Sequence, residues 1–276
     1  MINVNDISFS YGAVPCLKHI SLRLEQGKIY GLLGENGVGK TTLLTLLCGL
    51  KKPDSGSIEV DGAVPYKREP AFLESQFYLP DTVEAVRERA EDFAKVNGRL
   101  WPHFDLVKFK EIMELFEVDV RQKMNQMSSG QLKKTWISFA LACNPVNLYL
   151  DEPTNGLDIP SKAQFRKAVM SCTREDAVIV VSTHQVKDLE NIIDPIVILD
   201  NNQVLLNAGI EEICTRLFFD YGTSLKADSL YSEQIPGGFI QVYRNLTGED
   251  SKINIEALFN TVHKNKELVK EMFSHE

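Results

Sequence analysis

The segment GENGVGKTT, residues 34–42, carries the strongest chemical pattern in the sequence. It fits the spacing G-x-x-x-x-G-K-[ST], in which glycines let phosphate oxygens approach backbone N–H groups and the following helix adds its unpaired donors. Lys40 is predicted to reach the β- and γ-phosphates, and Thr41 is predicted to bind Mg²⁺ through its hydroxyl. The segment therefore predicts a site for a nucleoside triphosphate. The residues expected to contact it are Gly34, Asn36, Gly37, Gly39, Lys40, Thr41 and Thr42.

Acidic residues and a histidine follow two later apolar runs. In LYLDE, Asp151 is expected to join the Mg²⁺ shell through water, and Glu152 is placed to orient or deprotonate the water that attacks the γ-phosphate. His184 ends the run AVIVVSTH, and ligands bind at the carboxyl ends of strands in open α/β sheets. His184 is therefore predicted to contact the γ-phosphate. Taken alone, DE after an apolar run is more typical of a solvated strand end, and a lone histidine is more often a structural residue.

Composition and charge limit the classes of protein that fit. Hydrophobic residues make up 43% and charged residues 25%, which is usual for a globular protein. The sequence has no apolar run of eighteen residues and no secretory pattern, so neither a membrane span nor export is expected. Five scattered cysteines predict neither a disulfide framework nor a zinc site. The net charge of −8 opposes nonspecific binding to nucleic acid.

The elements that must position these residues alternate along the chain. Two-residue alternation up to about residue 29 predicts antiparallel strands, and short apolar runs predict strands buried in a parallel sheet. The fold class is therefore α/β: a P-loop NTPase core of mostly parallel sheet, an antiparallel β subdomain, an inserted helical subdomain at about 70–143 and a small α+β tail. Helices are expected at 40–50, 82–97, 106–117, 129–143, 161–171, 186–193, 209–219 and 253–273, and a hairpin in the tail at IPGGFIQVY.

The motifs in their order resemble the ATP-binding cassette of ABC transporters. GENGVGKTT, SSGQ, LYLDEPTNGLD and STHQ carry this resemblance over roughly residues 1–215, which leaves 216–276 as a C-terminal extension. The resemblance implies ATP and Mg²⁺ as ligands and a helical subdomain that docks on a membrane-spanning permease. It also implies that Tyr11 in FSYG stacks on adenine, although a turn tyrosine would look the same. Asp158 in NGLD resembles the aspartate of a loop at the subunit interface.

Residues 127–131, MSSGQ, resemble the family's signature segment L-S-G-G-Q, with Ser128, Gly130 and Gln131 as the matching residues. The resemblance implies that this segment binds the γ-phosphate held by a second subunit, so that two chains enclose two ATP molecules head to tail. A serine that caps an ordinary amphipathic helix would have the same pattern. Ser129 replaces a glycine, and its Cβ restricts the approach of phosphate, so we expect a weakened signature.

The family also places a glutamine at the hinge between the core and the helical subdomain, where it joins the Mg²⁺ shell. Gln76 in LESQFYLPDTVEAV is the candidate, and Glu74 or Tyr78 could occupy the site instead. The segment is shortened before TVEAV. If the hinge glutamine is absent, coupling to a partner is expected to change more than ATP binding.

Two functions of different classes fit these patterns. The first is the ATPase subunit of a membrane transporter, an exporter more than an importer, that pairs with a second cassette and lies on the cytoplasmic face of the membrane through its permease. The second is a soluble ABC-type ATPase that acts on ribosomes or DNA. The acidic charge, the single phosphate loop and the short segment between Lys40 and Asp151 count against the second. A P-loop GTPase is disfavoured further, since no N-K-x-D motif is present.

Overall fold

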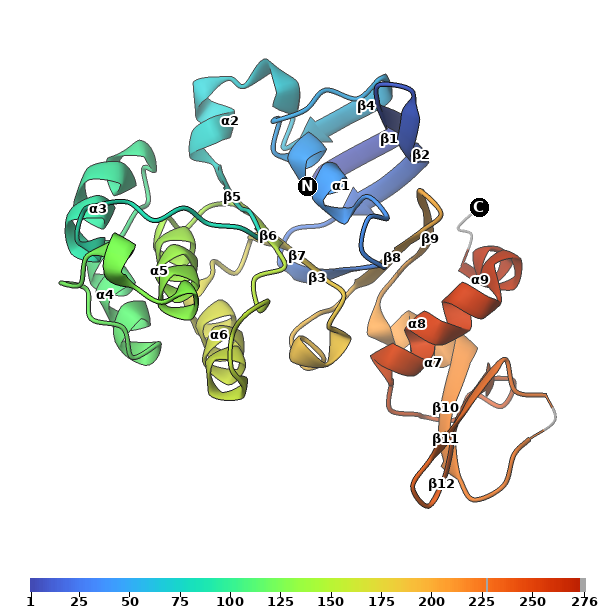
Figure 1. Cartoon of the computed structure of the whole chain (residues 1–276). Coiled ribbons are helices and arrows are strands. Elements are labelled where there is room, and N and C mark those ends of the chain that lie inside the picture. The colour runs from blue at the N-terminus through green and yellow to red at the C-terminus, as the bar shows by residue number, and fades with distance from the viewer. Residues whose placement is uncertain (227, 274–276) are drawn as a thin grey trace.

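The apolar runs form a central sheet in the order β5-β6-β7-β3-β8-β9 (Figure 1). Neighbours from β5 to β8 pair in parallel, and β9 pairs antiparallel with β8. All residues of β6, β7 and β8 are buried, as expected for strands covered on both faces. The computed structural model describes residues 1–226 and 228–273. Its central strands are β3 (Lys28–Leu33), β5 (Gln76–Leu79), β6 (Asn147–Asp151), β7 (Val178–Thr183), β8 (Ile196–Asp200) and β9 (Gln203–Ala208).

The N-terminal strands form a separate antiparallel sheet in the order β2-β1-β4. Its apolar side chains share one buried cluster with the leucines of α1 (Lys40–Leu47), which follows β3. The alternation of the sequence is thus explained, because one face of these strands packs inward while the other meets solvent. The strands are β1 (Ile2–Tyr11), β2 (Val14–Leu24) and β4 (Ser55–Val60).

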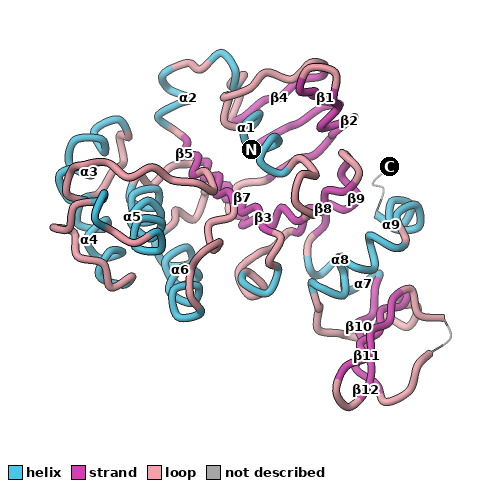
Figure 2. The backbone as a smooth tube through the Cα atoms, in the orientation of Figure 1, coloured by secondary structure: helices cyan, strands magenta, loops and turns pink. Residues whose placement is uncertain are grey.

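The region 70–143 is mainly helical and lies at the β5 edge of the central sheet (Figures 1 and 2). Phe139 is 1% exposed at the centre of an aromatic cluster, with ring centroids 5.8 Å from Phe77 and 5.7 Å from Trp101. This cluster holds the helices to β5. The elements are α2 (Pro70–Glu74), α3 (Ala90–Asn97), α4 (Leu106–Leu115) and α5 (Ser129–Ala142), with short 3-10 turns η1 (Pro65–Lys67), η2 (Gly98–Leu100) and η3 (Met124–Gln126).

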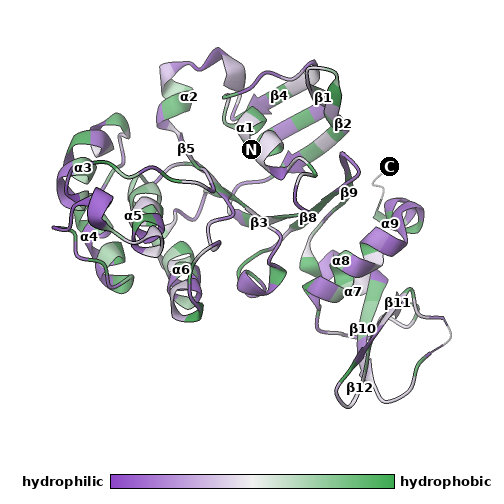
Figure 3. Ribbon diagram, in the orientation of Figure 1, coloured by the Kyte–Doolittle hydropathy of each residue, from purple (hydrophilic) through white to green (hydrophobic). Residues whose placement is uncertain are grey.

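The last part of the chain forms a small α+β unit, residues 217–273, which we call the C-terminal unit. Its strands pair antiparallel in the order β10-β12-β11, α8 packs on β11 and β12, and α9 packs on β9 of the central sheet. Figure 3 shows hydrophilic residues on the visible faces of α8 and α9. The elements from β6 onward are α6 (Ile159–Cys172), η4 (Val186–Asp188), α7 (Ile210–Arg216), β10 (Leu217–Gly222), β11 (Tyr231–Ile235), β12 (Gly238–Arg244), α8 (Ile255–Lys264) and α9 (Lys266–Phe273).

The fold class agrees with the prediction, and several helices differ from it. The helix expected at 82–97 begins only at Ala90, because the backbone of Arg89 forms an isolated β-bridge with Lys123. The helix expected at 186–193 is reduced to the turn η4 and further turns that lead into β8. Pro195 opposes a helical conformation at the residue before it, so a helix cannot continue into that strand.

The tail differs in two places. The helix expected at 209–219 ends at Arg216, and the following residues form β10, which the sequence analysis missed. The helix expected at 253–273 is divided at Asn265, whose side-chain amide donates to the carbonyls of Thr261 and Leu230, each at 3.0 Å. An amide that bonds to backbone carbonyls competes with the helical pattern, so α8 ends there and α9 begins.

Candidate functional site

The phosphate loop joins β3 to α1 and needs glycine at three of its positions. Gly37 and Gly39 have φ values of 82° and 113°, in the left-handed region that other residues rarely adopt. A Cβ on Gly34 would lie 2.7 Å from the backbone oxygen of Leu199. The glycine pattern is therefore required by backbone conformation and close packing, and it leaves the loop's N–H groups open to an anion.

The Lys40 side chain is 6% exposed and reaches across the loop. Its ammonium donates to the backbone oxygens of Gly34 at 2.7 Å and Glu35 at 3.1 Å, and lies 3.5 Å from Glu152 Oε1. Burial lowers the pKa of Lys40, and the Glu152 carboxylate opposes that shift. A buried ammonium with these contacts is a ready partner for phosphate oxygens.

Asp151, at the carboxyl end of β6, meets Thr41 from the start of α1. The Thr41 hydroxyl donates to Asp151 Oδ2 at 2.7 Å, and Tyr78 donates to the same oxygen at 3.3 Å. Ser182, its register partner on β7, donates to Asp151 Oδ1. Hydroxyl and carboxylate oxygens are the donors that Mg²⁺ prefers, so these residues fit that ion. Within the described residues no group of three acidic, His or Cys side chains forms a metal cage.

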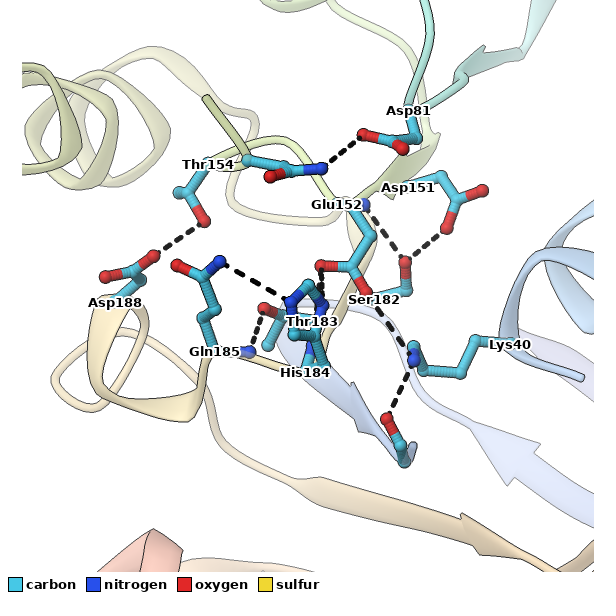
Figure 4. Close-up of polar contacts among 12 residues, drawn as sticks. Lys40, Asp81, Asp151, Glu152, Thr154, Ser182, Thr183, His184, Gln185 and Asp188 are labelled. Carbon is cyan, nitrogen blue, oxygen red and sulfur yellow. Dashed lines mark hydrogen bonds and ion pairs between the residues drawn. The ribbon is translucent and has the colours of Figure 1, made fainter. Parts of the chain in front are cut away.

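Glu152 lies between Lys40 and His184 (Figure 4). His184 Nδ1 is 3.0 Å from Glu152 Oε2, and the Glu152 side chain is 11% exposed. Its backbone has a φ of 45°, and its N–H donates to the Ser182 hydroxyl at 3.1 Å. Strained backbone of this kind is typical of functional sites. The arrangement holds one carboxylate oxygen toward the ammonium and the other toward the imidazole.

Lys40, Thr41 and Glu152 line a cavity of about 450 Å³. Tyr11, half-exposed, forms one wall, and its hydroxyl is 3.1 Å from the Thr42 hydroxyl. The Lys51 ammonium lies 4.7 Å from the centre of the Tyr11 ring. The sequence analysis missed some lining residues, which belong to segments without a motif. The cavity is lined by Tyr11, Val14, Pro15, Cys16, Asn36, Gly37, Gly39, Lys40, Thr41, Thr42, Asp81, Glu152 and Asn202.

The structure does not bring the signature segment to this cavity. Ser128 caps α5: its hydroxyl accepts from Gln131 N at 3.2 Å, and the Gln131 side chain accepts from Ser128 N at 3.0 Å. Gly130 follows in the first turn. Asp158 caps α6 and accepts from Ser161 N at 2.9 Å, and the hydrogen bonds from Ser161 lower the pKa of Asp158. The first turns of α5 and α6 therefore lie away from the chain's own Lys40.

Gln76 also lies away from the site, so the structure contradicts its placement in the Mg²⁺ shell. It is the first residue of β5 and pairs in register with Asn147, at the end of the sheet opposite to Asp151. Its side chain is buried and donates to the Cys48 carbonyl at 2.8 Å. Parallel strands present their carboxyl ends at one edge, so the residue that reaches the cavity comes after β5. That residue is Asp81, which lines the cavity.

Asp81 connects the cavity to α5 and to the loop after β6. The buried Lys133 ammonium lies 3.6 Å from Asp81 Oδ1 and donates to the backbone oxygens of Pro80 and Asp81. Asn155 donates to Asp81 Oδ1 at 3.3 Å. Burial lowers the pKa of Lys133, and Asp81 opposes this shift. A strand end followed by Pro-Asp was the signal in the sequence that could have found this residue.

Comparison with known proteins agrees with the fold and the cavity, which define a P-loop nucleotide-binding protein. The sequence model described as ABC transporter matches residues 17–155. The bacitracin transport ATP-binding protein BcrA of Bacillus licheniformis is 28% identical over 92% of this chain and 88% of its own length. The ABC transporter ATP-binding protein NatA of Bacillus subtilis is 30% identical, over 77% and 91%. A solved dimeric bacterial ABC transporter cassette, 20% identical, has a TM-score of 0.65 over 76% of this chain and 99% of its own.

The chain therefore belongs to the ABC transporter family, as an ATP-binding subunit that hydrolyses ATP. Among the residues that the structure describes, none of the helices has the length and hydropathy needed to cross a membrane.

Proposed function

We propose that the cavity beside the phosphate loop binds ATP with Mg²⁺, and that its hydrolysis powers export through a membrane-spanning permease. The observation that carries the proposal is that Lys40, Thr41 and Glu152 line one cavity, with Asp151 bonded to Thr41 and His184 in contact with Glu152. Ammonium, hydroxyl, carboxylate and imidazole are the groups that phosphoryl transfer to water requires. The Tyr11 ring offers its exposed face to the adenine, where stacking contributes about 1–3 kcal/mol.

In this proposal each residue of the phosphate site has one role. Lys40 leaves its carbonyl partners to bind the β- and γ-phosphates, and the loop N–H groups bind their oxygens, those of Asn36, Gly37 and Gly39 included. Thr41 and Asp151 hold Mg²⁺, which when bound neutralises charge on the phosphates. Asp81, in place of Gln76, offers its carboxylate to the same shell.

Glu152 receives the proton of the attacking water, or orients that water toward the γ-phosphate. In the structure its carboxylate is engaged by His184 and Lys40. Both partners are groups that bind phosphate, so the arrival of ATP gives them a better anion and frees Glu152 for the water. His184 then donates to the γ-phosphate.

A second copy of this chain, or a related cassette, completes the site. Ser128, Gly130 and Gln131 lie away from the chain's own cavity, at the start of a helix that presents N–H donors. Facing a partner, this segment would bind the γ-phosphate held by the partner's phosphate loop, and Asp158 would lie at the contact. The dimeric cassette with the same fold supports this arrangement.

The permease is proposed to dock at a cavity of about 580 Å³ between the core and the helical region, on the cytoplasmic face of the membrane. Leu50 and Leu100 border it and are 53% and 65% exposed, so the cavity offers apolar side chains to a partner. Export is favoured because one relative, SkfE of Bacillus subtilis, is a peptide export ATP-binding protein. We also propose the division of the chain at about residue 215, with 216–276 as an extension of the cassette.

Light scattering of the Glu152→Gln protein with and without Mg-ATP tests this function. The variant is expected to hold ATP without turnover, so its mass should rise from that of a 31.1 kDa chain to about twice that value. Lys40→Ala is the matched control and should stay a monomer. A Glu152→Gln protein that binds ATP and remains a monomer at every protein concentration would contradict the homodimer.

A further inference from the structure

The segment that follows His184 determines where its imidazole points. His184 ends the run from β7, and η4 begins two residues later. On one side the ring contacts Glu152, and on the other it borders a second cavity of about 420 Å³ that lies outside the nucleotide site. Because β7 is fixed in the sheet, the freedom of the ring depends on what holds the next few residues.

The inner side of this segment is held by groups of the core. The Asp188 carboxylate is 2.7 Å from the Lys162 ammonium of α6 and accepts from the Thr154 hydroxyl at 3.0 Å. Arg166 donates to the Asp188 carbonyl at 2.9 Å. The Asp188 and Lys162 side chains are 13% and 19% exposed, so this contact is shielded from solvent and from salt.

The outer side is held by the C-terminal unit. Helix α8 packs on η4, and the Glu256 carboxylate in its first turn lies 2.7 Å from the Lys187 ammonium. Phe259 and Asn260, one turn further along α8, form the wall of the second cavity that faces His184. The ion pair and the aromatic wall therefore contact this segment from the side of the C-terminal unit.

The C-terminal unit is itself fixed to the central sheet. Lys266 and His263 contact the buried Asp200 carboxylate at the end of β8, the histidine at 3.5 Å. Lys270 donates to the Gln203 side chain at 2.8 Å. Helix α8 therefore presents Glu256 from a fixed position relative to the phosphate loop, which lies beside the same strand.

We propose that α8 is a positioning element for His184, with Glu256 as its positioning residue. The inference rests on the proposed function, in which His184 acts on the γ-phosphate. The C-terminal unit would then set the rate of turnover without setting the affinity for ATP, because among the described residues none of those lining the nucleotide cavity comes from this unit. Any partner that moves α8 would change turnover through the same contact.

The test exchanges the two charges of the full-length protein. Glu256→Lys and Lys187→Glu each place like charges together, and the double variant restores an opposite pair. Each single variant is expected to lower kcat about threefold with an unchanged Kd for ATP, since exposed pairs have modest energies. The double variant should return kcat to the wild-type value. Hydrogen exchange of the amides in 184–193 should rise in each single variant and fall again in the double.

Glu267→Lys is the matched control, because Glu267 is the second residue of α9 as Glu256 is of α8, and both lie in the first turn. It should leave kcat and exchange unchanged. Exchange in 184–193 that does not respond to Glu256→Lys overturns the inference, as does an equal loss in the control or a loss of ATP affinity that matches the loss of kcat. His184→Ala separates the two proposals: full turnover in that variant refutes the role of His184, whereas exchange still reports the contact with α8.

Discussion

The helical region and the C-terminal unit both contact segments that border the nucleotide site, and the two sets of contacts differ in burial. On the helical side, the Lys133 side chain is 5% exposed and contacts Asp81, whose side chain is 44% exposed and lines the nucleotide cavity. On the other side, Lys187 and Glu256 are 78% and 52% exposed. A buried charge is costly to separate from its partner, whereas each member of an exposed pair can bind water instead at little cost. We infer that loss of the Lys133 contact changes turnover strongly, whereas loss of the Lys187–Glu256 pair changes turnover only slightly.

Substitutions in the catalytic centre are expected to have the largest effect on turnover. Glu152→Gln is expected to lower kcat by about 10²- to 10⁴-fold with ATP affinity retained, because the amide keeps the size of the side chain and loses the base. Steady-state kinetics and equilibrium binding of ATP measure the two effects. Lys40→Ala should instead abolish nucleotide binding. An equal loss of binding in both variants would contradict the roles given to the two residues.

The buried contact should have the next largest effect. Lys133→Met keeps the length of the side chain, removes the ammonium and leaves the backbone oxygens of Pro80 and Asp81 without their donor. We expect kcat to fall about tenfold, because Asp81 without its Lys133 partner would no longer be held in position for the proposed Mg²⁺ shell. Steady-state kinetics over a range of Mg²⁺ concentrations would show whether more ion is needed for half-maximal rate.

Lys134→Met is the matched control on the same helix. Its ammonium donates to the Phe116 carbonyl at 3.2 Å, away from the cavity. Each variant is expected to lower the free energy of unfolding by about 1–2 kcal/mol, and only Lys133→Met should lower kcat. If both variants lower kcat alike, α5 acts through general stability and the comparison between the two regions fails.

A buried acid on the C-terminal side offers a sharper version of the comparison. Asp200 is 8% exposed and bonds to Lys266 of α9. Lys266→Met should lower the free energy of unfolding by about 1–2 kcal/mol, since it leaves a buried carboxylate with weaker partners. Chemical denaturation measures this loss, which should exceed that of Glu256→Lys. The reverse order would show that burial does not decide the strength of these contacts.

The sequence places the centre of the candidate site more directly than its surroundings. The phosphate loop, Asp151 and Glu152 follow apolar strands directly, so a local pattern places them at one edge of the sheet. The hinge could not be placed in this way, because the position of Gln76 depends on where β5 starts, and its register with β6 is set by tertiary packing. The Lys187–Glu256 pair joins exposed residues far apart in the chain, and no periodic pattern marks such a contact.

A charge cluster at the surface of the helical region tests whether burial or location determines the strength of these contacts. Glu91 on α3 contacts Lys110 of α4 at 2.7 Å and Lys95 at 2.8 Å, and hydrogen bonds from Lys110 and then Lys95 lower the pKa of Glu91 to about 2. The folded pKa is below the ordinary 4.5, so the cluster stabilises the fold fully above pH 4.5 and loses this effect as pH falls toward 2.

Glu91→Gln should therefore be less stable than the wild type at pH 7, by a margin that narrows below pH 4.5 and in concentrated salt. Chemical denaturation of both proteins at pH 7 and pH 3.5 measures the difference in the free energy of unfolding. The measurement is repeated in about 1 M salt, which screens exposed charges. Since Glu91 lies in the same region as Lys133, a small, screened effect would assign the difference between the two contacts to burial. A large effect that resists salt would instead assign the difference between the two contacts to the helical region itself. The small effect expected of the Lys187–Glu256 pair would then need a cause other than exposure.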